Sequence, residues 1–203
     1  MSQKNKGIYS LLSNTFFYSL IQRIMSATSF REKIVKKYIT KNNVNVLDIG
    51  CGPGKILESL PKVKYFGYDI NPIYINDAKK KYKGLGNFFC KKFTNKELKK
   101  LPKFDHVLLL GILHHLNDAE VNALMLLLKK TLKKKGNIIT LDNIFSKKQN
   151  PIAKLLIKMD RGENVRTKDG YLRLIENHFK KINSKVYHQK FIPYTWFVTN
   201  CTR

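Results

Sequence analysis

The chain has 203 residues, and its 39 Lys and Arg against 14 Asp and Glu give a formal net charge of +25. Hydrophobic residues make up 43% of the chain, which suits one domain with a real core and excludes a disordered basic tail. Three cysteines, an odd number without paired spacing, exclude a disulfide-stapled scaffold.

The positive charge has two explanations. A basic excess of this size is typical of proteins that bind nucleic acid. However, 33 of the cations are Lys, and Lys, Asn and Ile together form about a third of the chain, whereas Ala occurs 5 times. These abundant residues share AT-rich codons, so a base-composition bias explains the surplus equally well. We favour that bias and keep nucleic acid as a less favoured partner.

The N-terminal region carries no evident targeting signal. Residues 8–25 are rich in apolar side chains, but Ser10, Ser13, Asn14 and Arg23 interrupt them. A membrane span needs about 20 nearly uninterrupted apolar residues, and a signal peptide needs a clean apolar run. The sequence therefore predicts no transmembrane segment, and the free cysteines favour the cytoplasm.

The predicted elements alternate along the chain. Apolar side chains near helical spacing predict one or two helices over 8–39. Strands are then expected at 44–50, 64–70, 87–93, 104–111 and 137–142, and helices from near 55, from 72, over 118–135 with Gly136 as its stop, and over 151–160 and 168–179. Asn71 and Pro72 suit an N-cap and a first helical position. Two strand-like runs, 185–189 and 194–200, follow.

This alternation predicts an α/β domain with a mostly parallel sheet, and the two late strands predict an antiparallel hairpin at one edge. We expect residues 1–43 to form a helical cap or lid and residues 44–203 to form the main domain, with a single domain overall.

One stretch of the sequence indicates a ligand-binding site. Residues 46–54, VLDIGCGPG, read as a buried strand that enters a glycine-rich turn before a helix. Glycines allow close backbone approach to a ligand, and a helix N-terminus offers free N–H groups. Asp69, at the end of the next strand, can accept both hydroxyls of a ribose. The G-x-G-x-G spacing differs from the G-x-G-x-x-G of dinucleotide sites, and no Walker loop is present.

These motifs resemble those of class I S-adenosylmethionine-dependent methyltransferases. DIGCGPG (48–54) is similar to the first motif of that family, Tyr68–Ile70 to its second, and the segments 104–105 and 111–116 to its fourth. The resemblance implies a Rossmann-like methyltransferase fold, a seven-stranded mostly parallel sheet with a C-terminal antiparallel hairpin and helices on both faces. The rest of the chain resembles a small bacterial single-domain subgroup, on residues 160–162, 165–166, 171, 193–195 and 201–203.

The resemblance implies S-adenosylmethionine as the cofactor, with S-adenosylhomocysteine as its product. It assigns cofactor contacts to Asp48, Gly50, Cys51, Gly52, Gly54, Asp69, Ile70, Phe93, Gly111 and Ile112. Asp48 also has a structural interpretation, as an acid that accepts N–H groups of the turn, and Cys51 one as a small filler. Lys92 stands where many members of the family carry an acid that contacts adenine, and a lysine cannot accept that hydrogen bond.

Candidate catalytic and substrate residues are less sharply indicated. His114 and His115 are adjacent, so one of them at most is expected to face the reaction centre, and His115 is slightly preferred as a proton acceptor. Arg161 and Arg166 could bind a substrate carboxylate or phosphate, or else form an internal ion pair with Asp160. Tyr9 and Gln22 could close over the site, with core packing as the alternative, and Tyr194 is a further substrate candidate.

The sequence therefore predicts an enzyme that moves a methyl group to an oxygen or nitrogen of a small molecule, sugar or lipid-linked intermediate. The segment LLLGILHH lacks the [DN]-P-P-[FY] motif of amino-methylating nucleic-acid enzymes. The alternatives are an RNA methyltransferase or RNA-binding module that uses the basic surface, and a fold that binds the cofactor but has lost catalysis. No metal site is predicted, because two adjacent histidines lack the usual ligand spacing, and the chain is expected to be a monomer or homodimer.

Overall fold

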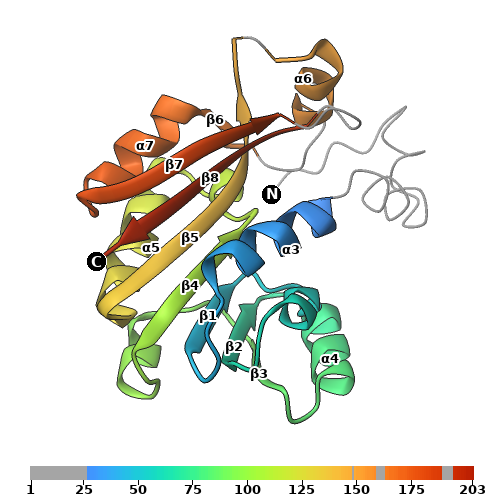
Figure 1. Cartoon of the computed structure of the whole chain (residues 1–203), viewed down its shortest axis with the longest axis vertical. Coiled ribbons are helices and arrows are strands. Elements are labelled where there is room, and N and C mark those ends of the chain that lie inside the picture. The colour runs from blue at the N-terminus through green and yellow to red at the C-terminus, as the bar shows by residue number, and fades with distance from the viewer. Residues whose placement is uncertain (1–26, 148, 159–162, 189–193) are drawn as a thin grey trace.

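A computed structural model describes residues 27–147, 149–158, 163–188 and 194–203 (Figure 1). The candidates Tyr9, Gln22, Asp160 and Arg161 lie outside these ranges, as does most of the predicted lid.

The described elements alternate as the sequence predicts. The strands are β1 (Asn45–Ile49), β2 (Lys64–Asp69), β3 (Gly86–Cys90), β4 (Phe104–Leu110), β5 (Leu132–Phe145), β6 (Arg166–Thr167), β7 (Lys181–His188) and β8 (Thr195–Thr202). The α-helices are α3 (Ala27–Tyr38), α4 (Pro72–Lys81), α5 (Asp118–Thr131), α6 (Pro151–Lys158) and α7 (Lys168–Glu176). Three short 3₁₀ helices complete the described part, η1 (Lys55–Ser59), η2 (Asn95–Lys99) and η3 (Leu113–His115).

The sheet confirms the predicted topology. Its strand order is β3-β2-β1-β4-β5-β8-β7, and the two-residue β6 pairs with β5 beside this seven-stranded path. Strands β1 to β5 pair in parallel, whereas β8 is antiparallel to both β5 and β7. The antiparallel hairpin thus lies at the edge formed by β7 and β8, as expected. The carboxyl ends of β1, β2 and β4 meet at one edge of the sheet, where ligands bind in open α/β folds.

Each face of the sheet packs against its own layer of helices. Successive side chains of a strand point to opposite faces, so neighbours such as Val46 and Leu47 enter different cores. Helices α3, α4 and α6 cover one face, and α5 and α7 cover the other. Helix α3 buries Phe30, Ile34 and Val35 in the first core, so the segment before residue 44 is part of the packed domain from Ala27 onward.

The predicted N-cap of α4 is confirmed. The Asn71 side chain accepts hydrogen bonds from the N–H groups of Ile73 and Tyr74 at 2.9 and 3.5 Å, and Pro72 occupies the first helical position. Helix α5 begins with a capping box in which Asn117 and Glu120 satisfy each other's backbone N–H groups. Both caps lie just after strands β2 and β4, so they fix the loops that border the ligand-binding edge.

The predicted end of α5 is wrong. The helix stops at Thr131 and not at Lys135, and the chain continues as β5. Leu132 is buried and pairs with Phe104, and the register then shifts before His106 pairs with Asn137. Gly136 lies in this irregular stretch, where an added Cβ would come within 2.7 Å of the Phe104 carbonyl oxygen. Burial of Leu132 and a close backbone approach therefore outweigh the helical pattern of the lysine-rich segment.

Two further properties of the described residues bear on the predictions. None of their helices combines the length and apolar character needed to cross a bilayer. The three cysteines are free thiols, with Cys51 and Cys201 buried and Cys90 exposed.

Candidate active site

Asp69 joins the glycine loop to the turn that follows β2. One carboxylate oxygen accepts the Gly52 N–H at 2.9 Å, and the other accepts the Asn71 N–H at 2.8 Å. The N–H groups of Gly50 and Cys51 donate to the Tyr68 carbonyl at 2.7 and 3.1 Å. A carboxylate oxygen has two acceptor sites, so Asp69 can still accept ribose hydroxyls while it holds the loop.

The three glycines of the loop all have positive φ values, but their surroundings differ. An added Cβ at Gly52 would meet nothing within 4 Å, so this position borders open space that a ligand can fill. A Cβ added at Gly50 would collide with the Ile112 side chain, so the loops after β1 and β4 lie in contact there. At Gly54 it would lie 2.7 Å from the Phe88 ring. Gly54 thus serves close packing at the start of η1, whereas Gly52 faces the ligand space.

Asp48 is buried beneath the loop, and its carboxylate forms its hydrogen bond with a side chain. The Tyr65 hydroxyl donates to its carboxylate at 2.6 Å, so the predicted capping of turn N–H groups is not what the structure shows. Burial raises the pKa of Asp48 to about 7, although the Tyr65 hydrogen bond and the nearby Arg31 oppose this. Burial likewise raises the pKa of the Cys51 thiol well above its ordinary value, so the thiol stays protonated and acts as a small filler.

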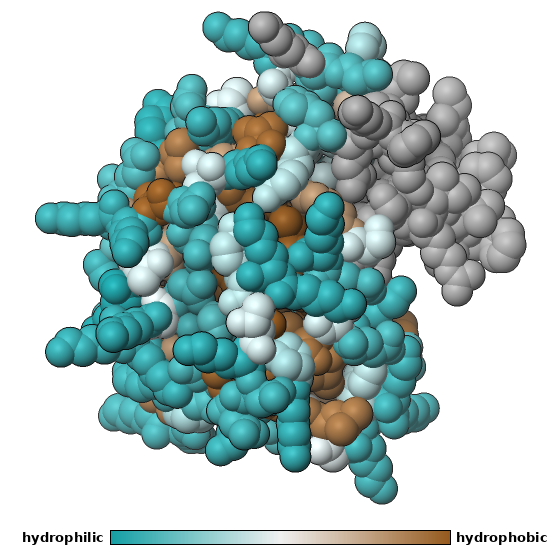
Figure 2. Space-filling view, in the orientation of Figure 1, coloured by the Kyte–Doolittle hydropathy of each residue, from teal (hydrophilic) through white to brown (hydrophobic). Residues whose placement is uncertain are grey.

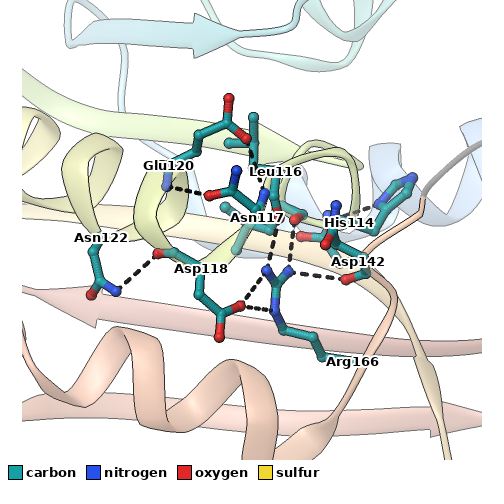
Figure 3. Close-up of polar contacts among 10 residues, drawn as sticks. His114, Leu116, Asn117, Asp118, Glu120, Asn122, Asp142 and Arg166 are labelled. Atoms are coloured by element: carbon teal, nitrogen blue, oxygen red, sulfur yellow. Dashed lines mark hydrogen bonds and ion pairs between the residues drawn. The ribbon is translucent and has the colours of Figure 1, made fainter. Parts of the chain in front are cut away.

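A buried histidine–carboxylate pair joins the loop after β4 to strand β5 (Figure 3). His114 Nδ1 lies 2.7 Å from Asp142 Oδ1, and the same oxygen accepts the His114 N–H at 3.2 Å. Both side chains are nearly inaccessible, at 5% and 1% exposure. Asp142 lies in β5, so two neighbouring parallel strands supply the pair at their carboxyl ends. Burial raises the pKa of Asp142, and its contact with His114 opposes that rise.

The position of this pair relative to the glycine loop matters for function. A Cβ added at Gly111 would lie 3.6 Å from His114 Cε1, so the imidazole stands directly beside the point where β4 ends. Ile112, the next residue, touches Gly50 of the first loop. The histidine ring therefore borders the end of β4, and Ile112 of the same loop contacts the glycine loop.

The two adjacent histidines differ as expected in their surroundings, but the preference for His115 is not supported. His115 is exposed, whereas His114 is buried against Asp142, and the two ring centroids are 4.1 Å apart. A carboxylate partner that orients the imidazole is the arrangement found in acid–base catalysis. The better candidate for a proton acceptor is thus His114.

Arg166 does not have the free guanidinium that the predicted substrate role requires. Its side chain donates to the carbonyl oxygens of Leu113, Leu116 and Asn164 at 3.0, 2.7 and 3.0 Å, and forms an ion pair with Asp118 (Figure 3). These contacts tie β6 to η3. The internal ion pair that the sequence analysis considered therefore exists for Arg166, but with Asp118 as the partner.

The sequence analysis missed Arg31. Its guanidinium Nη2 would lie 2.5 Å from a Cβ added at Gly111, and its charge lowers the pKa of both Asp48 and Asp142. A cation from α3 thus stands among the carboxylates at the ligand-binding edge, where it can receive the carboxylate of an amino-acid ligand. Its distance from the glycine motif in sequence gave no signal of this proximity.

The structure also places three other predicted contacts. Phe93 is buried and packs edge-on against Tyr68 with ring centroids 5.0 Å apart. Ile70 is 73% exposed beside Asp69, as an adenine contact requires. Tyr194 is buried, and its hydroxyl accepts the Asn143 side-chain amide at 3.0 Å. Lys92 is exposed.

No group of three metal-ligating side chains converges among the residues that the structure describes.

Comparison with known proteins identifies a domain in the middle of the chain. Residues 47–138 match the family model described as a methyltransferase domain, and they span the glycine loop, Asp69, the His114 loop and the start of β5. This match supports the resemblance to class I S-adenosylmethionine-dependent methyltransferases. The chain has no significant match among curated proteins.

Solved structures agree with the methyltransferase fold. The pyocyanin biosynthetic protein PhzM has a TM-score of 0.69 at 13% identity, with 98% of this chain and 62% of that chain covered. The mitomycin 7-O-methyltransferase MmcR has a TM-score of 0.66 at 16% identity, with 98% and 62% covered. The chain thus spans about three fifths of the length of these two proteins.

The N-methyltransferase NodS of Bradyrhizobium japonicum WM9, solved with S-adenosyl-L-homocysteine, has a TM-score of 0.62 at 12% identity. The alignment covers 98% of this chain and 93% of NodS. At these identities the likeness shows the fold.

Proposed function

We propose that this methyltransferase moves a methyl group from S-adenosylmethionine to a hydroxyl or amine of a small molecule, a sugar or a lipid-linked intermediate. The observation that carries the proposal is the buried His114–Asp142 pair beside Gly111, next to the glycine loop. The names of two structural neighbours, an O-methyltransferase and an N-methyltransferase, support an oxygen or nitrogen acceptor.

The described residues fit the cofactor. Gly52 borders open space, Asp69 reaches that space with acceptor oxygens, and Ile70 offers an exposed apolar surface. Arg31 is the cation that would hold the carboxylate of the amino-acid end. S-adenosylmethionine supplies a methyl group that its sulfonium has already activated, so the task of the protein is mainly to align the acceptor and exclude water.

His114 would take the proton of the acceptor. Its Nδ1 faces Asp142, and we assign the proton to the second ring nitrogen, Nε2. His114 would accept there the proton that the acceptor oxygen or nitrogen loses as it takes up the methyl group. Asp142 acts through His114, because it fixes the ring orientation and stabilises the imidazolium that forms.

The RNA methyltransferase alternative is less well supported. Two cations near the site are held by internal partners, Arg166 by Asp118 and Lys91 by Glu97. Exposed acids, among them Asp118, Glu120 and Glu163, stand at the same edge. A phosphate backbone would meet these negative charges before it reached the glycine loop.

Calorimetry with S-adenosylmethionine, S-adenosylhomocysteine and NAD tests the cofactor assignment. We expect binding of both sulfur compounds and none of NAD. Binding of NAD alone would contradict the proposal. The His114→Asn variant should bind S-adenosylhomocysteine as the wild type does, because its ring is not a cofactor ligand in this proposal.

A screen for methyl transfer tests the chemistry. Labelled methyl groups from S-adenosylmethionine are followed into phenols, amines and sugars. With a responding acceptor, His114→Asn should reduce kcat by about 100-fold to 10,000-fold, whereas the matched control His115→Asn should stay near wild type. Equal losses in both variants, or none in His114→Asn, would rule out His114 as the proton acceptor.

A further inference from the structure

Many exposed lysines lie at one end of the sheet. The loops and first strand residues at the amino ends of the parallel strands, together with the adjoining ends of β7 and β8, form what we call the lysine face. Its exposed cations are Lys41, Lys62, Lys64, Lys83, Lys99, Lys100, Lys103, Lys130, Lys133, Lys134, Lys135, Lys180, Lys181 and Arg203. Figure 2 shows long hydrophilic side chains along the lower border of the molecule, where these loops lie in Figure 1.

The contacts between these loops make the lysine face continuous. Lys103 Nζ donates to the Lys130 carbonyl at 2.6 Å, and the Arg203 N–H donates to the Gly136 carbonyl at 3.1 Å. Asn43 N–H donates to the Lys62 carbonyl at 2.7 Å, which joins the loops before β1 and β2.

His106 lies in β4, next to Asp105. Burial lowers the pKa of His106 most, and the charges of Lys133 and Lys41 lower it further. Two acids near this region are already paired, Asp105 with Lys133 at 2.8 Å and Glu58 with Lys81 at 2.6 Å, and Glu176 is exposed at the end of α7. Cations therefore far outnumber acids on this face.

The opposite end of the sheet, which carries the candidate active site, is mixed in charge. Its exposed acids Asp118, Glu120, Glu163 and Asp169 stand beside exposed lysines such as Lys55, Lys92, Lys96 and Lys168. Lysines occur at both ends, but the exposed acids gather at the active-site end. A bias toward lysine codons does not explain where the acids lie.

Helix dipoles explain only part of this clustering of lysines. Cations favour the last turn of a helix, and Lys79–Lys81, Lys129 and Lys130 occupy such turns. Lys103 donates to the Lys130 carbonyl in the last turn of α5, but Lys64 lies within β2 and Lys133–Lys135 lie within β5. Helix ends therefore leave part of the clustering without an explanation.

We propose that the lysine face binds the phosphate backbone of structured nucleic acid. Lysines attract phosphates without reading bases, and Asn42 and Asn43 add exposed hydrogen-bond donors between them. Among the large apolar side chains of the described residues, Leu85 is an exposed one near this face, and no exposed aromatic ring accompanies it. Stacking on single-stranded bases and insertion into a lipid bilayer therefore find little support here.

The face lies at the opposite end of the sheet from the glycine loop. The bound nucleic acid would thus be a partner that holds the enzyme in place and not the methyl acceptor. The proposal is independent of the small-molecule chemistry, because neither His114 nor Asp69 takes part in it.

Fluorescence anisotropy with a labelled RNA duplex tests the proposal on the full chain. We expect binding that weakens steeply with salt, because each neutralised phosphate releases counterions. The triple variant Lys62→Glu, Lys134→Glu and Lys135→Glu should weaken binding at least about tenfold. The matched control Lys154→Glu, Lys158→Glu and Lys168→Glu changes the net charge equally at the other end and should stay within about threefold of wild type.

Three outcomes would overturn the proposal. They are no measurable binding of the duplex by the wild type, equal losses in both triple variants, and tight binding to phosphatidylglycerol vesicles without binding to RNA. Calorimetry with S-adenosylhomocysteine runs in parallel on each variant. Unchanged cofactor binding in the face variant shows an intact fold and separates this result from any failure of the methyltransferase assignment.

Discussion

Arg166 donates two hydrogen bonds to a single oxygen of Asp118, from Nε at 2.9 Å and from Nη2 at 2.6 Å. The same guanidinium caps the carbonyl oxygens at both ends of η3, the turn that carries His114. The Asn164 N–H donates to the His114 carbonyl at 3.0 Å, so the residues around β6 hold this turn at three points. The site thus depends on a residue that never needs to touch the substrate.

Replacement of Arg166 should destabilise the protein more than replacement of its acidic partner. Arg166→Met leaves part-buried carbonyl groups without a donor, which costs about 2 to 4 kcal/mol of unfolding free energy. Asp118→Asn removes an exposed charge and should cost at most about 1 kcal/mol. Urea denaturation of both variants measures the difference. Equal losses would mean that the ion pair, and not the capping of η3, stabilises the turn.

Asp69→Ala should abolish detectable binding of S-adenosylhomocysteine in a thermal-shift assay. The substitution removes the acceptor that holds Gly52 and Asn71 and the proposed ribose contacts, and hydrogen bonds to a charged group contribute about 1.5 to 3 kcal/mol each. Asp77→Ala is the matched control, since Asp77 is an exposed acid on α4. A normal thermal shift in Asp69→Ala would contradict the ribose assignment.

Gly111→Ala should impair the site more than Gly84→Ala. Both glycines have positive φ values, of 84° and 79°, so each substitution carries a similar backbone strain of about 1 to 2 kcal/mol. At Gly84 the added Cβ meets nothing within 4 Å, whereas at Gly111 it would lie 2.5 Å from Arg31. Denaturation and cofactor calorimetry on the pair should show weaker cofactor binding in Gly111→Ala alone. Matching behaviour would mean that Arg31 moves aside freely.

Asp48 should make stability fall as the pH rises. Burial raises its pKa from 3.8 to about 7, so between these pH values the folded protein keeps a proton that the unfolded chain releases. The unfolding free energy therefore decreases with pH over this window, by up to about 4 kcal/mol in total. Asp48→Asn lacks this contribution, so the difference between wild type and variant should shrink toward low pH. Urea denaturation across the window measures it, and a pH-independent difference would contradict the shifted pKa.

The parts of the fold that depend on local chemistry could be predicted from the sequence. The glycine turn, the Asn71 cap and the alternation of strands and helices each have a short-range signal. The end of α5 could not be predicted, because Leu132 leaves the helix to pair with Phe104 in another strand. Lysines that favour a helix locally could not reveal that pairing.

The residues of the candidate site that belong to a sequence motif could be predicted. The residues that only tertiary contacts bring together could not. Asp69 follows from its spacing to the glycine loop, but the partnership of His114 with Asp142 joins two strands that are separate in sequence. The predicted strand over 87–93 ends at Cys90, so Phe93 lies beyond β3, where it packs in the core.

The bridge from Asp69 to Gly52 and Asn71 has a thermodynamic consequence. Because the carboxylate fixes both loops through the fold itself, the cofactor meets a cradle whose backbone is already ordered. The entropy cost of ordering the loops is then part of the free energy of folding, and it does not reduce the free energy of cofactor binding. We therefore expect the heat capacity change on cofactor binding to reflect buried apolar surface alone, without the larger change that accompanies coupled folding.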